Sequence, residues 1–179
     1  MELVGTMFSG QFGVAKNIVG DNMSPIYTYA VETAIQITLT ELNENLREIY
    51  IEAYTMPETA EYIYVHTTAE LKQIFGSNFP GYTESDFYEM EIGTSGIMRN
   101  YMARKCDIHF PLDHKLRRFL TAAMRVYKVP EEEQAKAIAF IGSLDIRAIA
   151  TEVMYKLFAM LEMTFDFKLS KDDEMGETR

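Results

Sequence analysis

Signals that start an α-helix recur along the chain and constrain its fold more than any other feature. Ser24 precedes Pro25, which pairs an N-cap residue with proline in the first helical turn. Thr55 stands three residues before Glu58, in the spacing of a capping box. Pro130 is followed by three glutamates, whose charges favour the positive end of a helix dipole. Strand-like alternation is almost absent, so these signals predict an all-α protein.

The predicted architecture is a bundle of seven to eight helices in a single domain over 1–170. Only 10 glycines and 5 prolines occur in 179 residues, which favours long helices over a turn-rich β fold. The last residues, 171–179, carry charge without periodicity, so we expect a disordered tail there. The expected helices span about 2–18, 25–42, 45–55, 57–75, 84–105, 112–127, 130–142 and 145–165.

Composition and charge limit the surroundings and the partners of the chain. A net charge of -10 is repelled by phosphate backbones unless the basic residues cluster. The N-terminus lacks the charged and apolar regions of a signal peptide, and no apolar stretch approaches the roughly 20 residues that span a bilayer. The single cysteine, Cys106, cannot form an intramolecular disulfide. We therefore expect a cytoplasmic protein that has no membrane partner.

Motifs of known chemistry are missing from the sequence. None of the three histidines follows a glutamate at the spacing of a di-iron bundle, and no zincin, nucleophile-elbow or Walker motif occurs. Cys106 could pair with His109 on a metal, or act as a nucleophile favoured by Arg104 and Lys105, but a structural cysteine is the simpler interpretation. We expect no enzymatic activity, no metal and no cofactor.

Three of the expected helices carry stripes that mix aromatic side chains with uncharged polar ones. Such stripes, facing one another, would build a small-molecule pocket. Ordinary core packing is the alternative, because aromatic and Met stripes usually fill a core. The residues that helical spacing selects as ligand-binding are Tyr29, Thr33, Tyr62, His66, Phe87, Met90, Glu91, Thr94, Met98 and Tyr101. Glu91 is the first to test, because a buried carboxylate needs a partner and a cationic ligand would be one.

Two further helical features leave alternatives open. Gly93 and Gly96 lie in the middle of the helix 84–105, where glycine costs about 1 kcal/mol relative to alanine. Close approach of a neighbouring helix in the same subunit or a helix–helix dimer contact would compensate. The helix 145–165 has a wide apolar arc, so it is either central in the bundle or in contact with another subunit.

Several segments together resemble the C-terminal regulatory half of TetR-family transcriptional regulators. The segments that carry the resemblance are 46–54, 57–75, 96–104, 116–120 and 125–131. The resemblance implies a domain that binds a small effector in an internal pocket and dimerises through a four-helix bundle. It gives the dimer role to the helices 84–105 and 112–127. The implied interface residues are Gly93, Gly96, Ile97, Leu116, Phe119, Leu120 and Ala123.

The DNA-binding half of that family has no counterpart here. Before Ser24 we expect one helix with a single lysine, Lys16, which would correspond to the helix that joins the two halves. The hypothesis is a homodimeric effector-sensing domain that takes a small, lipophilic molecule and reaches DNA only through a helix-turn-helix absent from this chain. The alternative is a helical dimerisation or interaction module without a small ligand.

Overall fold

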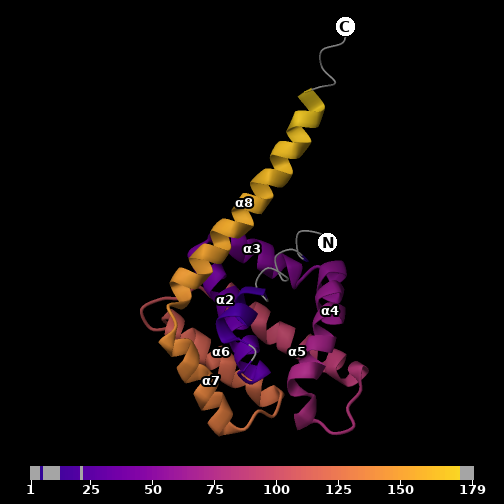
Figure 1. Ribbon diagram of the computed structural model, residues 1–179, viewed down its shortest axis with the longest axis vertical. Coiled ribbons are helices and arrows are strands. Elements are labelled where there is room, and N and C mark those ends of the chain that lie inside the picture. The colour runs from indigo at the N-terminus through magenta and orange to yellow at the C-terminus, as the bar shows by residue number, and fades with distance from the viewer. Residues whose placement is uncertain (1–4, 6–12, 21, 174–179) are drawn as a thin grey trace.

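The computed structural model describes residue 5, residues 13–20 and residues 22–173, with side chains described up to residue 159. Within these residues every regular element is helical, and the only bridge is an isolated one between Asp107 and Phe110. The predicted all-α class is confirmed. A helical segment at 13–19 precedes the helices labelled in Figure 1. These are α2 (Pro25–Leu42), α3 (Glu44–Ala53), α4 (Pro57–Phe75), α5 (Glu84–Ala103), α6 (Leu112–Val126), α7 (Glu131–Ser143) and α8 (Ile146–Asp173), with a short 3₁₀ turn η1 (Gly76–Asn78) after α4.

The predicted cap of α2 is confirmed, and the predicted capping box before α4 is not. Ser24 caps α2, and Thr83 caps α5 in a capping box with Asp86. The predicted capping box of Thr55 and Glu58 is wrong, because α4 begins after Met56 without a side-chain cap. Thr55 instead donates its hydroxyl to the carbonyl of Ile51, 2.6 Å away. The preceding helix therefore holds this side chain.

The C-terminal helix is longer than the sequence predicts. Helix α8 runs to Asp173, so 171–173, the first residues of the expected tail, are helical, while 174–179 lie outside the described residues. Its first turns pack on α2, and the rest extends away from the bundle (Figure 1). The buried side chains of its described part are Ala150, Val153 and Leu157. Met160, Leu161 and Phe165, which complete its apolar arc, lie outside the described side chains.

Helix α2 is the centre of the bundle, since it contacts each of the helices α3 to α8. Its buried residues include polar ones, which lie among alanine, valine, isoleucine and leucine. The hydroxyls of Thr38 and Thr40 donate hydrogen bonds to backbone carbonyls of the preceding turn, at 2.7 Å each. The polar groups of this buried helix that the helix itself does not satisfy therefore need partners on its neighbours.

Candidate ligand-binding cavity

A small cavity of about 50 Å³ lies between α2, α4 and α5. Its polar wall consists of Tyr29, Glu32, Thr33 and Gln36 of α2, Tyr54 at the C-terminal end of α3, Thr67 and Glu70 of α4, and Glu91, Thr94 and Ser95 of α5. Its apolar wall consists of Leu71, Ile74, Met98 and Phe119. Thr67, Glu70 and Ile74 are partly exposed, so the cavity reaches solvent along α4. The volume suffices for a water or two or for the head group of a small molecule.

Hydroxyl groups surround the carboxylate of Glu91 at the inner end of this cavity. Ser95 donates to Oε1 at 2.7 Å and Thr94 to Oε2 at 2.8 Å, both from the following turn of α5. The Tyr127 hydroxyl lies 3.3 Å from Oε2. The ring of Tyr127 is fixed by parallel stacking on Phe75, with 4.2 Å between centroids. The sequence predicts that a ligand would be the partner of the Glu91 carboxylate. In the structure, hydroxyl groups of the same subunit already fill that role.

Three polar groups of α2 in the same cavity have no such partners. Gln36 is only 3% exposed, yet its amide forms no hydrogen bond with a described residue. The Tyr29 hydroxyl also lacks a hydrogen bond within the described part of the chain, and that residue is 8% exposed. Glu32, which is half-buried, makes neither a hydrogen bond nor an ion pair there. None of their polar atoms is fully inaccessible, so these three groups mark where water or an additional partner can bind in the cavity.

The carboxyl groups of the cavity share a raised pKa. Burial, followed by the nearby charges of Glu70 and Glu91, raises the pKa of Glu32 from 4.5 to about 8. Burial also raises the pKa of Glu70. For Glu91, burial raises the pKa and outweighs the hydrogen bonds from Ser95, Thr94, Thr67 and Tyr127. Among the described residues, no lysine or arginine lines the cavity. A bound cation would therefore favour the ionised form of all three carboxyl groups.

The structure brings together half of the residues that the sequence selects for ligand binding. Those that line the cavity are Tyr29, Thr33, Glu91, Thr94 and Met98. Tyr62 and His66 stack on each other at 3.8 Å on the outside of α4, where His66 is exposed. Phe87 is fully buried against Phe79, at 5.7 Å between centroids, in the apolar core. Met90 and Tyr101 are half-buried and do not line the cavity.

The lining residues absent from that selection include Glu32, Gln36, Thr67, Glu70 and Ser95, as well as the apolar Leu71 and Ile74. A signal for Glu32 exists in the sequence. Glu32 lies three residues after Tyr29 and four before Gln36, so the helical spacing that selects Tyr29 selects it as well. On α4, the cavity lies beside the stripe of Thr67, Leu71 and Ile74 and not beside the neighbouring stripe of Tyr62 and His66.

The residues that the resemblance assigns to a dimer interface fall into two groups. Four of them are buried within the subunit, with exposures of 4% or less: Leu116, Phe119, Leu120 and Ala123. Their side chains pack the subunit's own core, and Phe119 lines the cavity. Gly93 is exposed, and Gly96 and Ile97 are half-buried. An added Cβ at either glycine would meet no atom within 4 Å, so close approach of a helix in the same subunit does not explain these glycines.

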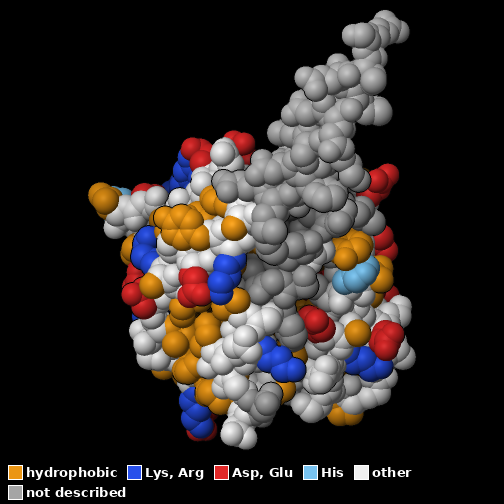
Figure 2. Space-filling model, turned by 45° about the horizontal axis from the view of Figure 1, so that its top comes forward, with side chains coloured by type: hydrophobic (Ala, Val, Ile, Leu, Met, Phe, Trp, Pro, Cys, Tyr) orange, Lys and Arg blue, Asp and Glu red, His pale blue; other side chains and the backbone are white. Residues whose placement is uncertain are grey.

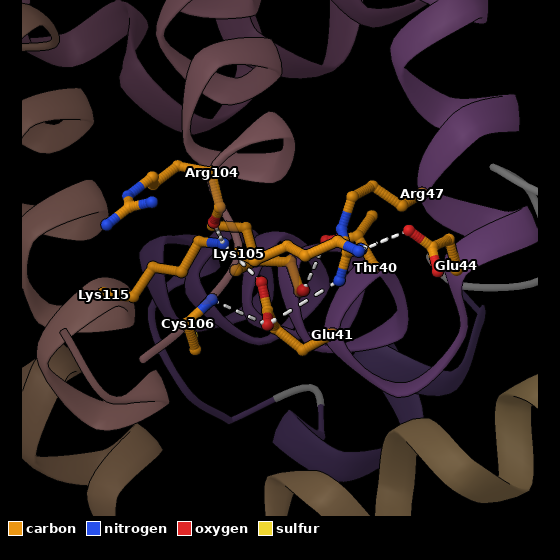
Figure 3. Close-up of polar contacts among 9 residues, drawn as sticks. Thr40, Glu41, Glu44, Arg47, Arg104, Lys105, Cys106 and Lys115 are labelled. Atoms are coloured by element: carbon orange, nitrogen blue, oxygen red, sulfur yellow. Dashed lines mark hydrogen bonds and ion pairs between the residues drawn. The ribbon is translucent and has the colours of Figure 1, made fainter. Parts of the chain in front are cut away.

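A second polar cluster lies near the C-terminal end of α2 and is far better satisfied (Figure 3). The fully buried Lys115 donates to Glu41 at 2.5 Å and to the carbonyl of Arg104. The other oxygen of Glu41 accepts the backbone N–H of Cys106 at 3.0 Å and lies 3.8 Å from Arg47. Among the described side chains, Arg47 Nε is the one fully inaccessible polar atom without a hydrogen bond. The cluster joins α2 to α3, α6 and the loop before α6.

Cys106 belongs to this structural cluster. Burial and the neighbouring Glu41 raise the pKa of its thiol to about 11, so the thiol is protonated at neutral pH. His109, its suggested metal partner, lies in the loop that follows and is exposed. The described residues contain no group of three or more His, Cys, Asp or Glu side chains that could hold a metal ion. The position of Cys106 therefore agrees with the structural interpretation of this cysteine.

A second hollow of about 370 Å³ opens between α6, α7 and the start of α8. Its apolar lining includes Leu116, Leu120 and Ile141, and its charged lining has two residues of each sign: Asp113, Arg117, Asp145 and Arg147. Lysine and arginine side chains are scattered among acidic ones on the described part of the face in Figure 2. This groove has the volume of a ligand site, but its balanced charges do not select a ligand.

Comparison with known proteins identifies no relatives. No family model matches the chain, and neither a curated protein nor a solved structure shows significant similarity. Among the described residues, no helix is both long enough and apolar enough to cross a bilayer.

Proposed function

We propose that this chain is a ligand-sensing helical domain, in which the cavity between α2, α4 and α5 receives the polar head of a small molecule. The observation that carries the proposal is the unpaired amide of Gln36, which is 3% exposed and lines the cavity beside Tyr29 and Glu32. A ligand that supplies hydrogen bonds to these groups offsets the cost of burying them. Leu71, Ile74, Met98 and Phe119 offer an apolar wall to its remaining atoms, which suits a lipophilic molecule.

Volume alone favours the groove beside α6, but the chemistry of the lining favours the smaller cavity. About 50 Å³ accepts only a few non-hydrogen atoms, so the rest of the ligand would extend toward solvent past the partly exposed Thr67, Glu70 and Ile74. Ligand binding would couple α2 and α4 directly, because groups of both helices line the site. Helix α2 contacts every other described helix from α3 to α8, so a small shift of it would reach the whole bundle.

A thermal-shift screen with two tryptophan variants tests this function. The screen uses small cations, neutral alcohols and amides, and carboxylates, each with aliphatic and aromatic tails. Ile74→Trp fills the mouth of the cavity, while Val65→Trp places the same side chain at an exposed position of the same helix, outside the lining. We expect concentration-dependent stabilisation of the wild type and of Val65→Trp that Ile74→Trp loses. No stabilising compound, or equal stabilisation of all three proteins, would contradict the proposal.

We also propose that the active form is a homodimer, with the exposed side of α5 at the contact. Ile92 is 45% exposed on this side, next to Gly93, Gly96 and Ile97. Gly93→Lys has room in the subunit, because an added Cβ meets nothing within 4 Å. We expect sedimentation of a dimer for the wild type and of a 20.6 kDa monomer for this variant. Glu133→Lys, exposed on α7, is the control and should stay dimeric. A monomeric wild type at tens of micromolar would contradict the dimer.

The wider role remains that of a TetR-like regulatory domain that reaches DNA through a helix-turn-helix outside this chain. The all-helical bundle and the internal cavity between helices support it, and the net charge of -10 argues against DNA contact by these residues themselves. A salt-sensitive shift of duplex DNA by this chain would contradict that division of roles. The alternative function, an interaction module without a ligand, is favoured by the small volume of the cavity. The thermal-shift screen separates it from the ligand-sensing function.

A further inference from the structure

We propose that the ligand of the cavity between α2, α4 and α5 is an organic ammonium ion, with its charged group bound by Tyr29, Glu32 and Gln36. This inference rests on the proposed ligand-sensing function and adds the chemical class of the ligand. It depends on what the three side chains can accept and on the charge around them.

The three unpaired groups of α2 match the donors of an ammonium ion. A primary ammonium carries three N–H donors and no acceptor. The Glu32 carboxylate, the Gln36 amide oxygen and the Tyr29 hydroxyl oxygen are three acceptors, spaced three and four residues apart on one face of one helix. None of them is engaged by a described residue, whereas Glu91 is already engaged by hydroxyl donors. Glu32 is therefore the carboxylate that is free to form a charge-assisted hydrogen bond with the ligand.

The charges that face Glu32 favour a cation and disfavour an anion. They come from Glu70 on α4 and Glu91 on α5, and the neighbouring titratable groups are Tyr29 on α2, Tyr50 on α3 and Tyr54 after it. Helix α6 contributes Phe119 to the lining, and no basic side chain from the described part of the chain lines the cavity. The rings of Tyr29 and Tyr54 add aromatic surface, which attracts cations. The described residues contain no group of three or more His, Cys, Asp or Glu side chains that could hold a metal ion, and the apolar wall of the cavity suits the hydrocarbon part of an organic cation.

Ionisation of Glu32 links this binding to pH. With the pKa of Glu32 raised to about 8, the carboxyl group is largely protonated at neutral pH and ionises above it. An alkylammonium stays charged up to about pH 10, as lysine does. Ammonium binding is therefore expected to strengthen from about pH 6.5 to about pH 9 and to release a proton near neutral pH.

The test is calorimetric titration at constant ionic strength with three probes of the same length: n-butylammonium, n-butanol and butanoate. The proteins are the wild type, Glu32→Gln and the control Glu133→Gln, which removes an equal charge from an exposed position of α7. We expect the wild type and Glu133→Gln to bind butylammonium at least about tenfold more tightly than butanol. Glu32→Gln is expected to lose this preference and its pH dependence, while circular dichroism shows that it folds. The side-chain amide resonance of Gln36 is expected to shift on binding.

Every other outcome contradicts the inference, and each one identifies which claim fails. Equal or tighter binding of butanol or butanoate would refute the ammonium and leave the ligand-sensing cavity standing. Equal losses in Glu32→Gln and Glu133→Gln would show that the probe follows net charge and not the cavity. Binding of none of the three probes would refute the ammonium as well. The ligand-sensing function fails too only if the wider screen also yields no compound that Ile74→Trp excludes.

Discussion

Helix α2 carries two glutamates that face neighbouring helices, Glu32 and Glu41. Their pKa values are shifted in opposite directions, because only Glu41 has a cationic partner. Glu41 meets Lys115 at 2.5 Å and the N–H of Cys106 at 3.0 Å. Burial raises its pKa, but these hydrogen bonds and the lysine charge outweigh burial, so the pKa of Glu41 is lowered. Glu32 meets two other glutamates and no cation, and its pKa rises to about 8. Partners therefore decide whether such a carboxylate joins helices together or remains available for binding.

The two regions have opposite effects on stability as pH changes. The pKa of Glu41 is lower in the folded state than in the unfolded state, so its contribution is present above the unfolded pKa and is lost as pH falls. The pKa of Glu32 is higher in the folded state than in the unfolded state. Its contribution to the stability of the fold is therefore fully present below pH 4.5 and is lost as the pH rises toward 8. Maximum stability is therefore expected at mildly acidic pH.

The largest effect is expected when the paired region loses its cation. Lys115→Met leaves Glu41 buried without its main partner, so the free energy of unfolding should fall by about 3 to 5 kcal/mol. Urea unfolding at neutral pH measures it. Lys136→Met, which breaks an exposed ion pair with Glu132, is the control and should change stability by about 0.5 kcal/mol or less.

A double variant shows whether the unpaired charge is the cause. Lys115→Met combined with Glu41→Gln should recover much of the loss, because no buried charge then remains without its lysine. A loss below about 1 kcal/mol in the single variant, or no recovery in the double variant, would remove the distinction between the two glutamates.

A smaller effect of opposite sign is expected in the unpaired region. Glu32→Gln removes a charge that other carboxylates repel, so it should stabilise the fold at about pH 9 by on the order of 1 to 2 kcal/mol. The full pKa shift would convert to more, but the side chain is partly exposed to water, which screens it. At about pH 4 the two proteins should be nearly equally stable, because Glu32 is then largely protonated in both the folded and the unfolded state. Urea unfolding at the two pH values checks this, and equal stability at both would show that Glu32 is not repelled.

The sequence predicts the helices well because their ends depend on local chemistry. The ranges 25–42 and 57–75 are reproduced without error by α2 and α4, since a proline begins each. The side that each helix turns to the cavity depends on tertiary packing instead. On α4 the stripe of Tyr62 and His66 and that of Thr67 and Leu71 are adjacent, and periodicity does not say which one faces α2.

Helical spacing places Glu32 on the same face of α2 as Tyr29 and Gln36, but the structure is needed to show that Glu32 lacks a partner. A glutamate on a helix is most often exposed, and Glu41 on the same helix shows that even a buried one can be fully paired. The sequence places both glutamates on α2 but does not show that Lys115, far along the chain, reaches only one of them. The glycines of α5 are a similar case, since their open surroundings appear only in three dimensions.

The smallest effect concerns the two buried glutamines, which extend the same comparison. Gln36 is 3% exposed and unpaired, whereas Gln134 is 6% exposed and donates to the carbonyl of Val129 at 2.7 Å. Gln36→Leu keeps the size of the side chain and removes an unsatisfied amide, so it should be neutral or stabilising by up to about 1 kcal/mol. Gln134→Leu removes a made hydrogen bond and should cost about 1 kcal/mol.

Thermal and urea unfolding of the two leucine variants, each compared with the wild type, gives the sign of both effects. If Gln36→Leu were destabilised as much as Gln134→Leu, the Gln36 amide would have a partner in solution. The cavity would then be satisfied without a ligand. If the signs differ as expected, the amide of Gln36 is retained at no gain in stability, which is the pattern of a residue kept for binding.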